Sequence, residues 1–155
     1  MGIADISNKN KKAMETIAEI NDLFLEVTGW IGGEADTTIK HLYGKWQELM
    51  SEPENAITKA FVDKCIKLID ECIAFREDIV EKGRFFAENA RDKISSVNKC
   101  VPEDKDIKSI LDDELGLWNK HGQPQLVFLF ERAEQLELSI RDIINVITKP
   151  IEVVK

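Results

Sequence analysis

The sequence predicts an all-α protein in which an antiparallel helical hairpin is extended by additional C-terminal helices. Apolar residues recur every three or four positions over most of the 155-residue chain, which is the periodicity of an amphipathic helix. Only 4 prolines and 8 glycines are present, and long stretches contain neither. No stretch has the alternation of apolar and polar residues that is typical of a strand. We therefore expect one helical domain, residues 1–155, forming a hairpin or an elongated bundle.

The first predicted helix runs from about residue 7 to residue 28, with Ser7 as its N-cap and Gly29 just beyond its end. Its apolar stripe is Met14, Ile17, Ile20, Phe24 and Val27. A second helix is expected after the glycine-rich stretch 29–33 and should reach Met50. Its apolar positions step in heptads, which favours packing against another helix: Ala35, Ile39, Leu42, Trp46 and Leu49.

The third predicted helix follows a possible break. Ser51 and Glu54 have the spacing of a capping box, and Pro53 suits a first helical turn. Either a new helix begins there or one long helix kinks. The apolar seam continues over residues 54–98 with a slip at Lys82–Gly83, and its members are Ile57, Phe61, Cys65, Leu68, Cys72, Phe75, Ile79, Phe86, Ala90, Ile94 and Val97. A helix of this length implies an elongated hairpin or coiled coil.

Two further helices are predicted in the C-terminal part. One should run from Pro102 to Gly122 and is acidic between Glu103 and Glu114. Its apolar face is Ile107, Ile110, Leu111, Leu115 and Trp118. The last helix should begin after Gly122, with Pro124 in its first turn, and end at Pro150. Its wide stripe is Leu126, Leu129, Phe130, Ala133, Leu136, Ile140, Ile143, Ile144 and Ile147.

Composition excludes several classes of function. The formal net charge of −8 argues against a nucleic-acid partner, which would require a basic face. No apolar run approaches the roughly 20 residues that span a bilayer, and the N-terminus lacks the pattern of a signal peptide. We therefore expect a cytoplasmic protein without membrane insertion. Cys65 and Cys72 fall on the apolar seam, which predicts reduced, buried thiols that pack as small hydrophobic groups.

No set of residues has the pattern of a catalytic or metal site. His41 and His121 lie far apart in the sequence, and neither belongs to a zinc-protease or di-iron motif. The acids of residues 103–114 lack the order of a calcium loop. We predict no catalytic residue, no metal and no cofactor; an enzymatic role would require a pocket with perturbed carboxylates.

The stretch GWIGG, residues 29–33, is the most informative local motif. Gly29, Gly32 and Gly33 are expected to supply the backbone angles of a reversal between the first two helices. Trp30 would then lie at the mouth of the hairpin. It either closes the end of the bundle as a hydrophobic plug or offers an exposed aromatic surface to a partner.

Trp30-Ile31-Gly32, between two amphipathic helices, resembles the Trp-x-Gly turn of the WXG family, the small helical-hairpin proteins exported by type VII secretion systems. Ala35 and Trp46 resemble the small residue and the second tryptophan that follow the turn in that family. The resemblance covers residues 7–97. It implies assembly as a homodimer or heterodimer and export without a cleaved signal peptide, with Trp30 and Gly32 defining the turn. Residues 98–155 have no counterpart in the short form of the family.

These observations lead to two hypotheses of function. In the first, the protein is a non-catalytic helical protein that acts by protein–protein association, as a type VII secretion substrate or as the co-secreted partner of a larger toxin. In the alternative, it is a cytosolic immunity protein or antitoxin. Its acidic helical face, including Asp112, Asp113 and Glu114, would then cover the basic surface of a toxin.

Overall fold

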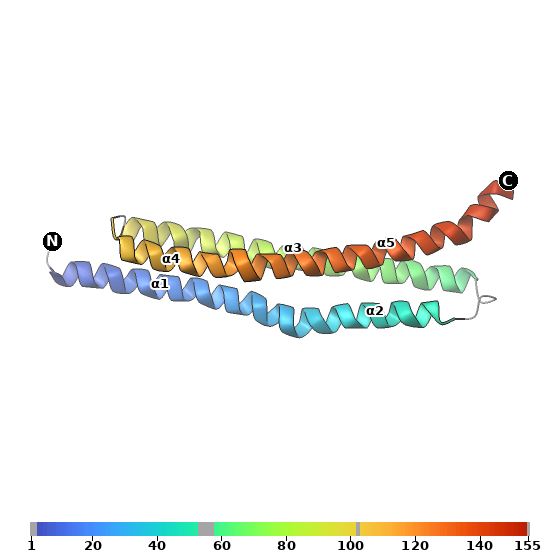
Figure 1. Ribbon diagram of the computed structural model, residues 1–155, viewed down its shortest axis with the longest axis horizontal. Coiled ribbons are helices and arrows are strands. Elements are labelled where there is room, and N and C mark those ends of the chain that lie inside the picture. The colour runs from blue at the N-terminus through green and yellow to red at the C-terminus, as the bar shows by residue number, and fades with distance from the viewer. Residues whose placement is uncertain (1–2, 53–57, 102, 155) are drawn as a thin grey trace. The chain divides into compact units, whose positions relative to one another are not determined.

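The computed structural model describes residues 3–52, 58–101 and 103–154, and its regular structure is helical (Figure 1). In chain order the helices are α1 (Ile3–Trp30), the π-helix η1 (Ile31–Ala35), α2 (Asp36–Met50), α3 (Lys59–Cys100), α4 (Lys105–Leu117), the π-helix η3 (Trp118–Gly122) and α5 (Gln123–Val154). No strand occurs in the described residues. The prediction of an all-α fold is confirmed.

The contacts between residues group the chain into two compact units. Unit 1 comprises Met1–Gly32 and Glu81–Leu126, and therefore holds α1, the second half of α3, α4 and η3. Unit 2 comprises Gly33–Val80 and Val127–Lys155, and holds α2, the first half of α3 and most of α5.

In unit 1, α1 packs on α4 and η3, and the second half of α3 runs antiparallel to α1 (Figure 1). Two contacts establish that direction. Lys93 Nζ lies 2.8 Å from Glu19 Oε2, and Lys82 Nζ lies 5.4 Å from the ring centroid of Trp30. The buried apolar side chains of this unit are Ala13, Ile17, Ile20, Val27, Phe86, Ala90, Val97, Val101, Ile107, Leu111 and Leu126.

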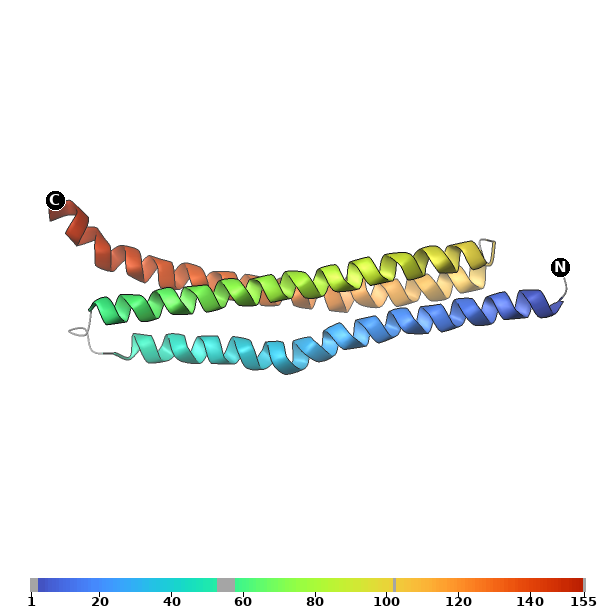
Figure 2. The same ribbon diagram turned by 180° about the vertical axis from the view of Figure 1, so that it is seen from behind.

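In unit 2, α2 and the first half of α3 form an antiparallel hairpin (Figure 2). Ion pairs connect Lys45 with Glu71 and Lys64 with Glu52, so residue numbers rise along α2 as they fall along α3. The helix α5 joins this pair. The buried apolar side chains are Ala35, Ile39, Leu42, Leu49, Phe61, Cys65, Leu68, Ile69, Cys72, Phe75, Ile79, Leu129, Ala133, Leu136 and Ile140.

Between α2 and α3 the helix is broken, because α2 ends at Met50 and α3 begins at Lys59. Ser51 lies at the C-terminal end of α2, where its hydroxyl donates to Glu48 O at 2.8 Å. Thr58 Oγ1 accepts from the backbone N–H of Phe61 and so caps the first turn of α3. Pro53, Glu54, Ile57 and Pro102, to which the sequence assigned roles in helix initiation or packing, lie outside the described residues.

The predicted reversal at residues 29–33 is wrong. Helix continues from α1 through η1 into α2, and no glycine among the described residues has a positive φ. The spacing of the buried residues gives the reason. Heptad steps connect Ile20 with Val27 and Ala35 with Leu42, but Val27 and Ala35 are eight positions apart. The π-helix takes up that extra residue, because its wider turn holds one residue more than an α-helical turn.

The predicted break between Gly122 and Pro124 is also wrong. Gln123 N–H donates to Trp118 O, five residues earlier, and η3 passes directly into α5. Here too one step of the apolar stripe is lengthened, since Leu126 lies eight positions after the half-buried Trp118 and seven before Ala133. Proline at position 124 lacks one N–H donor, a loss that one wide turn can absorb.

Other predicted boundaries shift. Helix α1 begins at Ile3, so Ser7 and Gly29 lie inside it, and α5 continues through Pro150 to Val154. A proline costs a helix one backbone hydrogen bond, and near a helix end few bonds depend on it. The helix α4 begins at Lys105, because Asp104 Oδ1 accepts from Ile107 N–H at 3.0 Å.

Most predicted stripe residues are buried, with two clear exceptions. Met14 is 41% exposed, and its neighbour Ala13 takes the buried position. Ile110 is 38% exposed, because Ile107 and Leu111 already fill the core side of α4.

Candidate interaction surfaces

Trp30 of the Trp-x-Gly motif and the second tryptophan, Trp46, both lie on helices. Trp30 is half-buried at the end of α1, with Lys82 over its ring, and Gly32 is exposed within η1. Trp46 is half-buried on α2 and belongs to unit 2, whereas Trp30 and Gly32 belong to unit 1. The structure therefore gives Trp30 a cation–π contact in place of a position at the mouth of a turn.

The acidic cluster of α4 divides into exposed and half-buried members. Asp112 and Asp113 are exposed. Glu114 lies seven residues after Ile107 and three after Leu111, so it faces the core side of the helix. Its Oε1 is buried without a hydrogen-bond partner among the described residues, and this burial raises the pKa of the carboxyl. Glu114 is therefore poorly placed for a surface contact.

The solvent side of α4 carries alternating acidic and apolar residues. Asp106, Ile110, Asp113 and Leu117 follow one another at intervals of four, three and four positions, which places them on one stripe. All are exposed, and neither aspartate has an ion-pair partner among the described side chains. We call these four residues the α4 stripe. Large apolar side chains interrupted by unpaired acids are unusual on a purely solvated face.

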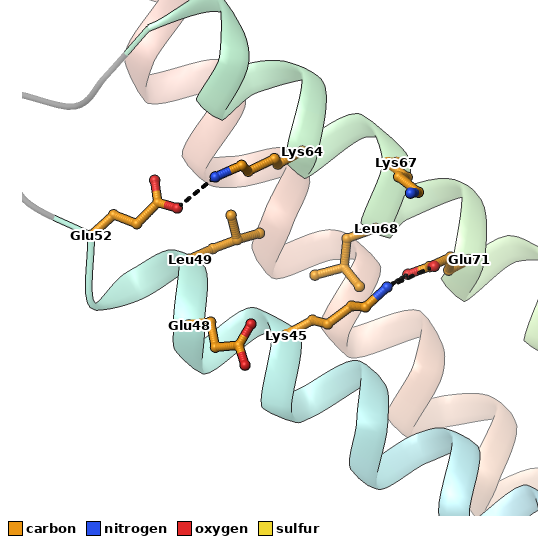
Figure 3. Close-up of a pocket in the computed structure, with 8 residues that line it drawn as sticks. All are labelled: Lys45, Glu48, Leu49, Glu52, Lys64, Lys67, Leu68 and Glu71. Carbon is orange, nitrogen blue, oxygen red and sulfur yellow. Dashed lines mark hydrogen bonds and ion pairs between the residues drawn. The ribbon is translucent and has the colours of Figure 1, made fainter.

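A groove of about 240 Å³ lies between α2 and α3 in unit 2 (Figure 3). Leu49 and Leu68 form its apolar part. Ion pairs cross it at both ends: Lys45 Nζ lies 2.9 Å from Glu71 Oε1, and Lys64 Nζ lies 3.0 Å from Glu52 Oε1. Glu48 and Lys67 complete the lining. The groove thus contains equal numbers of lysines and glutamates, which leaves no surplus charge to select an ionic ligand.

Unit 1 has a more apolar hollow of about 330 Å³ between α3 and α4. Phe86 and Trp118 stack in it, and its other lining residues are Ala87, Ala90, Arg91, Ile94, Leu115 and Asn119. Apart from Arg91, no titratable side chain lines it. The hollow offers packing surface and no group for acid–base chemistry.

A buried charged cluster connects α3 and α5 within unit 2. Glu137 is 7% exposed and accepts from Arg76 Nη2 and from Arg141 Nε, the latter at 2.9 Å. Arg76 Nη1 also lies 3.9 Å from Glu134 Oε2, and its guanidinium lies 5.5 Å from the ring centroid of Phe130. No motif in the sequence indicates this cluster. The one available signal was that Glu137 follows Ala133 by four positions and precedes Ile140 by three, which is a core position.

Cys65 and Cys72, on the apolar face of α3, are buried, as predicted, and their thiols are free. Burial, together with Glu137 and Glu71, raises the pKa of Cys72 to about 11, although Arg76 acts in the opposite direction. Burial and Glu52 raise the pKa of Cys65 as well. Both thiols stay protonated near neutral pH, which makes them poor nucleophiles.

Within the described residues, no three His, Cys, Asp or Glu side chains are grouped as metal ligands would be. None of the helices in that part of the chain is long and apolar enough to span a bilayer. Comparisons of the chain with protein-family models, with curated protein sequences and with solved structures gave no match.

Proposed function

We propose that this protein acts without catalysis, by binding a partner protein that presents a basic surface to the α4 stripe. The observation that carries the proposal is the stripe itself. Ile110 and Leu117 expose apolar area, while Asp106 and Asp113 have no cationic partner among the described side chains. Apolar contacts supply affinity at such a surface, and complementary charge supplies specificity and a fast association rate.

Binding of this kind suits an immunity protein or antitoxin that masks the basic surface of a toxin. The net charge of −8 supports the same role, because it steers a cationic partner toward the protein. Of the two hypotheses drawn from the sequence, this one has the stronger geometric support, since Asp112 and Asp113 are exposed.

Export by a type VII system is the second candidate function, and the Trp30-Ile31-Gly32 motif with Ala35 and Trp46 supports it. The helical backbone of residues 29–33 gives no support to the hairpin turn that the resemblance implies. Export would be measured as the tagged protein in the medium of the source cells. Trp30→Ala should abolish export and leave the helical circular dichroism unchanged; a protein that is never exported would eliminate this candidate.

The α4 proposal is tested by reversing charge on the exposed face. A tagged chain is cross-linked in its source cells, the bound protein is identified, and its affinity is measured with purified components. Asp106→Lys with Asp113→Lys should weaken binding by about tenfold or more at low salt, because two attractions become repulsions. The effect should shrink at 0.5 M salt.

The matched control reverses two exposed acids on α3 of the same unit that have no ion-pair partner among the described side chains, Glu88→Lys with Asp92→Lys. Both variants change the net charge equally, so a general loss of electrostatic steering would affect them alike. An equal loss in the two variants, or no loss in either, would refute the assignment of the α4 face.

A further inference from the structure

Large apolar side chains also lie exposed on unit 2, along one side of α3. Ile66 and Val80 are each 46% exposed, and Ile73 lies half-buried midway between them. The three residues are spaced by seven positions, so they form one line along the helix. A heptad line of β-branched residues is the pattern by which one helix packs against another.

The helix α5 contributes to the same face. Arg76, three positions after Ile73, reaches both Glu134 and Glu137 of α5. Residues three or four apart are neighbours on a helix surface. Ile73 is such a neighbour of Arg76 on α3, and Leu138 follows Glu134 by four positions on α5. Ile73 and Leu138 therefore flank the same Arg76–Glu134 contact. Leu138 is 46% exposed. We call Ile66, Ile73, Val80 and Leu138 the α3–α5 seam.

The charges around this seam are mostly acidic, although the exposed Lys59 lies seven positions before Ile66 on the same line of α3. Arg76 and Arg141 are matched by Glu134 and Glu137. Asp70 and Glu77 lie between the heptad positions of α3, and Glu131 lies seven positions before Leu138. These three acids have no ion-pair partner among the described side chains, and all are exposed.

We infer that the α3–α5 seam binds an amphipathic helix of a partner protein whose apolar stripe is flanked by lysines or arginines. Such a helix would add to α2, α3 and α5, bury the seam and pair with Asp70, Glu77 and Glu131. A second copy of this chain would bring like charges together at the same rim, which opposes self-association. An anionic membrane surface would be repelled for the same reason.

This inference shares with the proposed function only the premise that the occupant is a protein; its surface lies in unit 2, and the α4 stripe lies in unit 1. The two can therefore fail separately. Variants of the seam should leave binding at Asp106 and Asp113 unchanged, and variants of those aspartates should leave binding at the seam unchanged.

The probe is a synthetic 21-residue helical peptide with leucine at heptad a and d positions and lysine at e and g, titrated into the full chain by isothermal calorimetry. Ile66→Glu and Leu138→Glu should each weaken binding at least tenfold. Asp70→Lys with Glu77→Lys should weaken it several-fold and remove its salt dependence. A peptide with glutamate in place of each lysine should not bind. Circular dichroism and the thermal midpoint of each variant verify its fold.

The matched control is Val146→Glu, on the other side of α5. Val146 is 68% exposed and lies 18 positions, or five full turns, after Phe128. The Phe128 ring contacts Arg132, which in turn contacts Tyr43 of α2, so this side of α5 faces away from the seam. Val146→Glu should bind the peptide as the wild type does.

Three results would overturn the inference: peptide binding that Ile66→Glu and Leu138→Glu leave intact, equal loss in Val146→Glu, or no binding of the lysine peptide at all. Sedimentation equilibrium supplies the remaining comparison. A dimer that Ile66→Glu dissociates would make a second copy of the chain the occupant and would also refute the inference.

Discussion

Phe86 and Trp118 stack face to face in unit 1, with ring centroids 3.8 Å apart and planes within 13° of parallel. Gly122 lies against the same indole. A Cβ atom built at Gly122 would come 2.9 Å from Trp118 Cζ3, a separation that real Cβ contacts essentially never show, and 3.2 Å from Cδ2, which is tighter than most. The indole is therefore held between Phe86 and the backbone at residue 122, and glycine is needed there for close approach.

Gly122→Ala should destabilise the protein by about 1–2 kcal/mol. Alanine favours helix over glycine by roughly 0.5–1 kcal/mol, but displacing the stacked indole incurs an overpacking cost of about 1–3 kcal/mol. Urea denaturation followed by tryptophan fluorescence measures the difference. Gly116→Ala is the control, because a Cβ there has nothing within 4 Å and should stabilise the helix. Stabilisation by both substitutions would show that the indole can move freely.

The helical path through residues 29–33 makes a prediction opposite to that of a turn. Gly32 and Gly33 have no positive φ, and a Cβ at either would have nothing within 4 Å. Each change to alanine should therefore raise the free energy of unfolding by roughly 0.5–1 kcal/mol. Gly44→Ala, inside α2, is the positive control with the same open surroundings. Destabilisation at 32 or 33, with stabilisation at 44, would indicate a turn instead of helix.

The helices and most of the core could be predicted because both follow from a local repeat. Ile39, Cys65 and Ala133 were assigned to buried stripes by spacing alone, and each is fully buried. The periodicity that a helix needs in order to bury one face is written directly into the order of apolar residues. No knowledge of the neighbouring helices was required.

The π-helices lie where glycine and proline favour a break in the helix, and the spacing of the apolar residues favours its continuation. Glycine in a helix costs only about 1 kcal/mol relative to alanine, which burial of flanking residues easily offsets. The eight-position steps from Val27 to Ala35 and from Trp118 to Leu126 were the better signal. Each eight-position step is one residue longer than a heptad, and each contains a π-helix, whose turn holds one residue more than an α-helical turn.

The cluster around Glu137 could not have been predicted in the same way. Its two arginines come from different helices, Arg76 on α3 and Arg141 on α5, and no local pattern relates Arg76 to Glu137. Only the register between those helices brings the groups together. The α3–α5 seam also depends on the register between these two helices. Arg76 and Arg141 are paired with Glu134 and Glu137, so the remaining charges at the rim of the seam are acidic.

The free energy of unfolding should fall at alkaline pH because the thiol of Cys72 is buried. Its pKa is about 11 in the folded protein against 9.0 for the unperturbed thiol. Between these values the unfolded thiol loses its proton and the folded thiol keeps it, so stability is lost as pH rises from 9 to 11. At about 1.4 kcal/mol for each pKa unit, the loss approaches roughly 2–3 kcal/mol.

Urea denaturation at pH 7.5, 9 and 10.5 measures that loss. Cys72→Val keeps the site apolar and removes the titrating group, so it serves as the control for tyrosine and lysine titration. The difference between wild type and Cys72→Val should change steadily above pH 9. Parallel curves over the whole range would show that burial does not hold the proton on this thiol.

The strongest single-residue effect is expected at Arg76. Arg76→Met leaves the buried carboxylate of Glu137 with Arg141 as its one cationic partner, and should cost about 3 kcal/mol of stability. Arg76→Met with Glu137→Met removes both charges and should be much less destabilising than the sum of the single changes, because an apolar pair of similar volume replaces a desolvated ion pair. Arg84→Met, on the same helix, breaks only the exposed Arg84–Glu81 pair and should cost less than about 0.5 kcal/mol. Additive effects at 76 and 137, or equal effects at 76 and 84, would show that the cluster contributes no more than a surface ion pair.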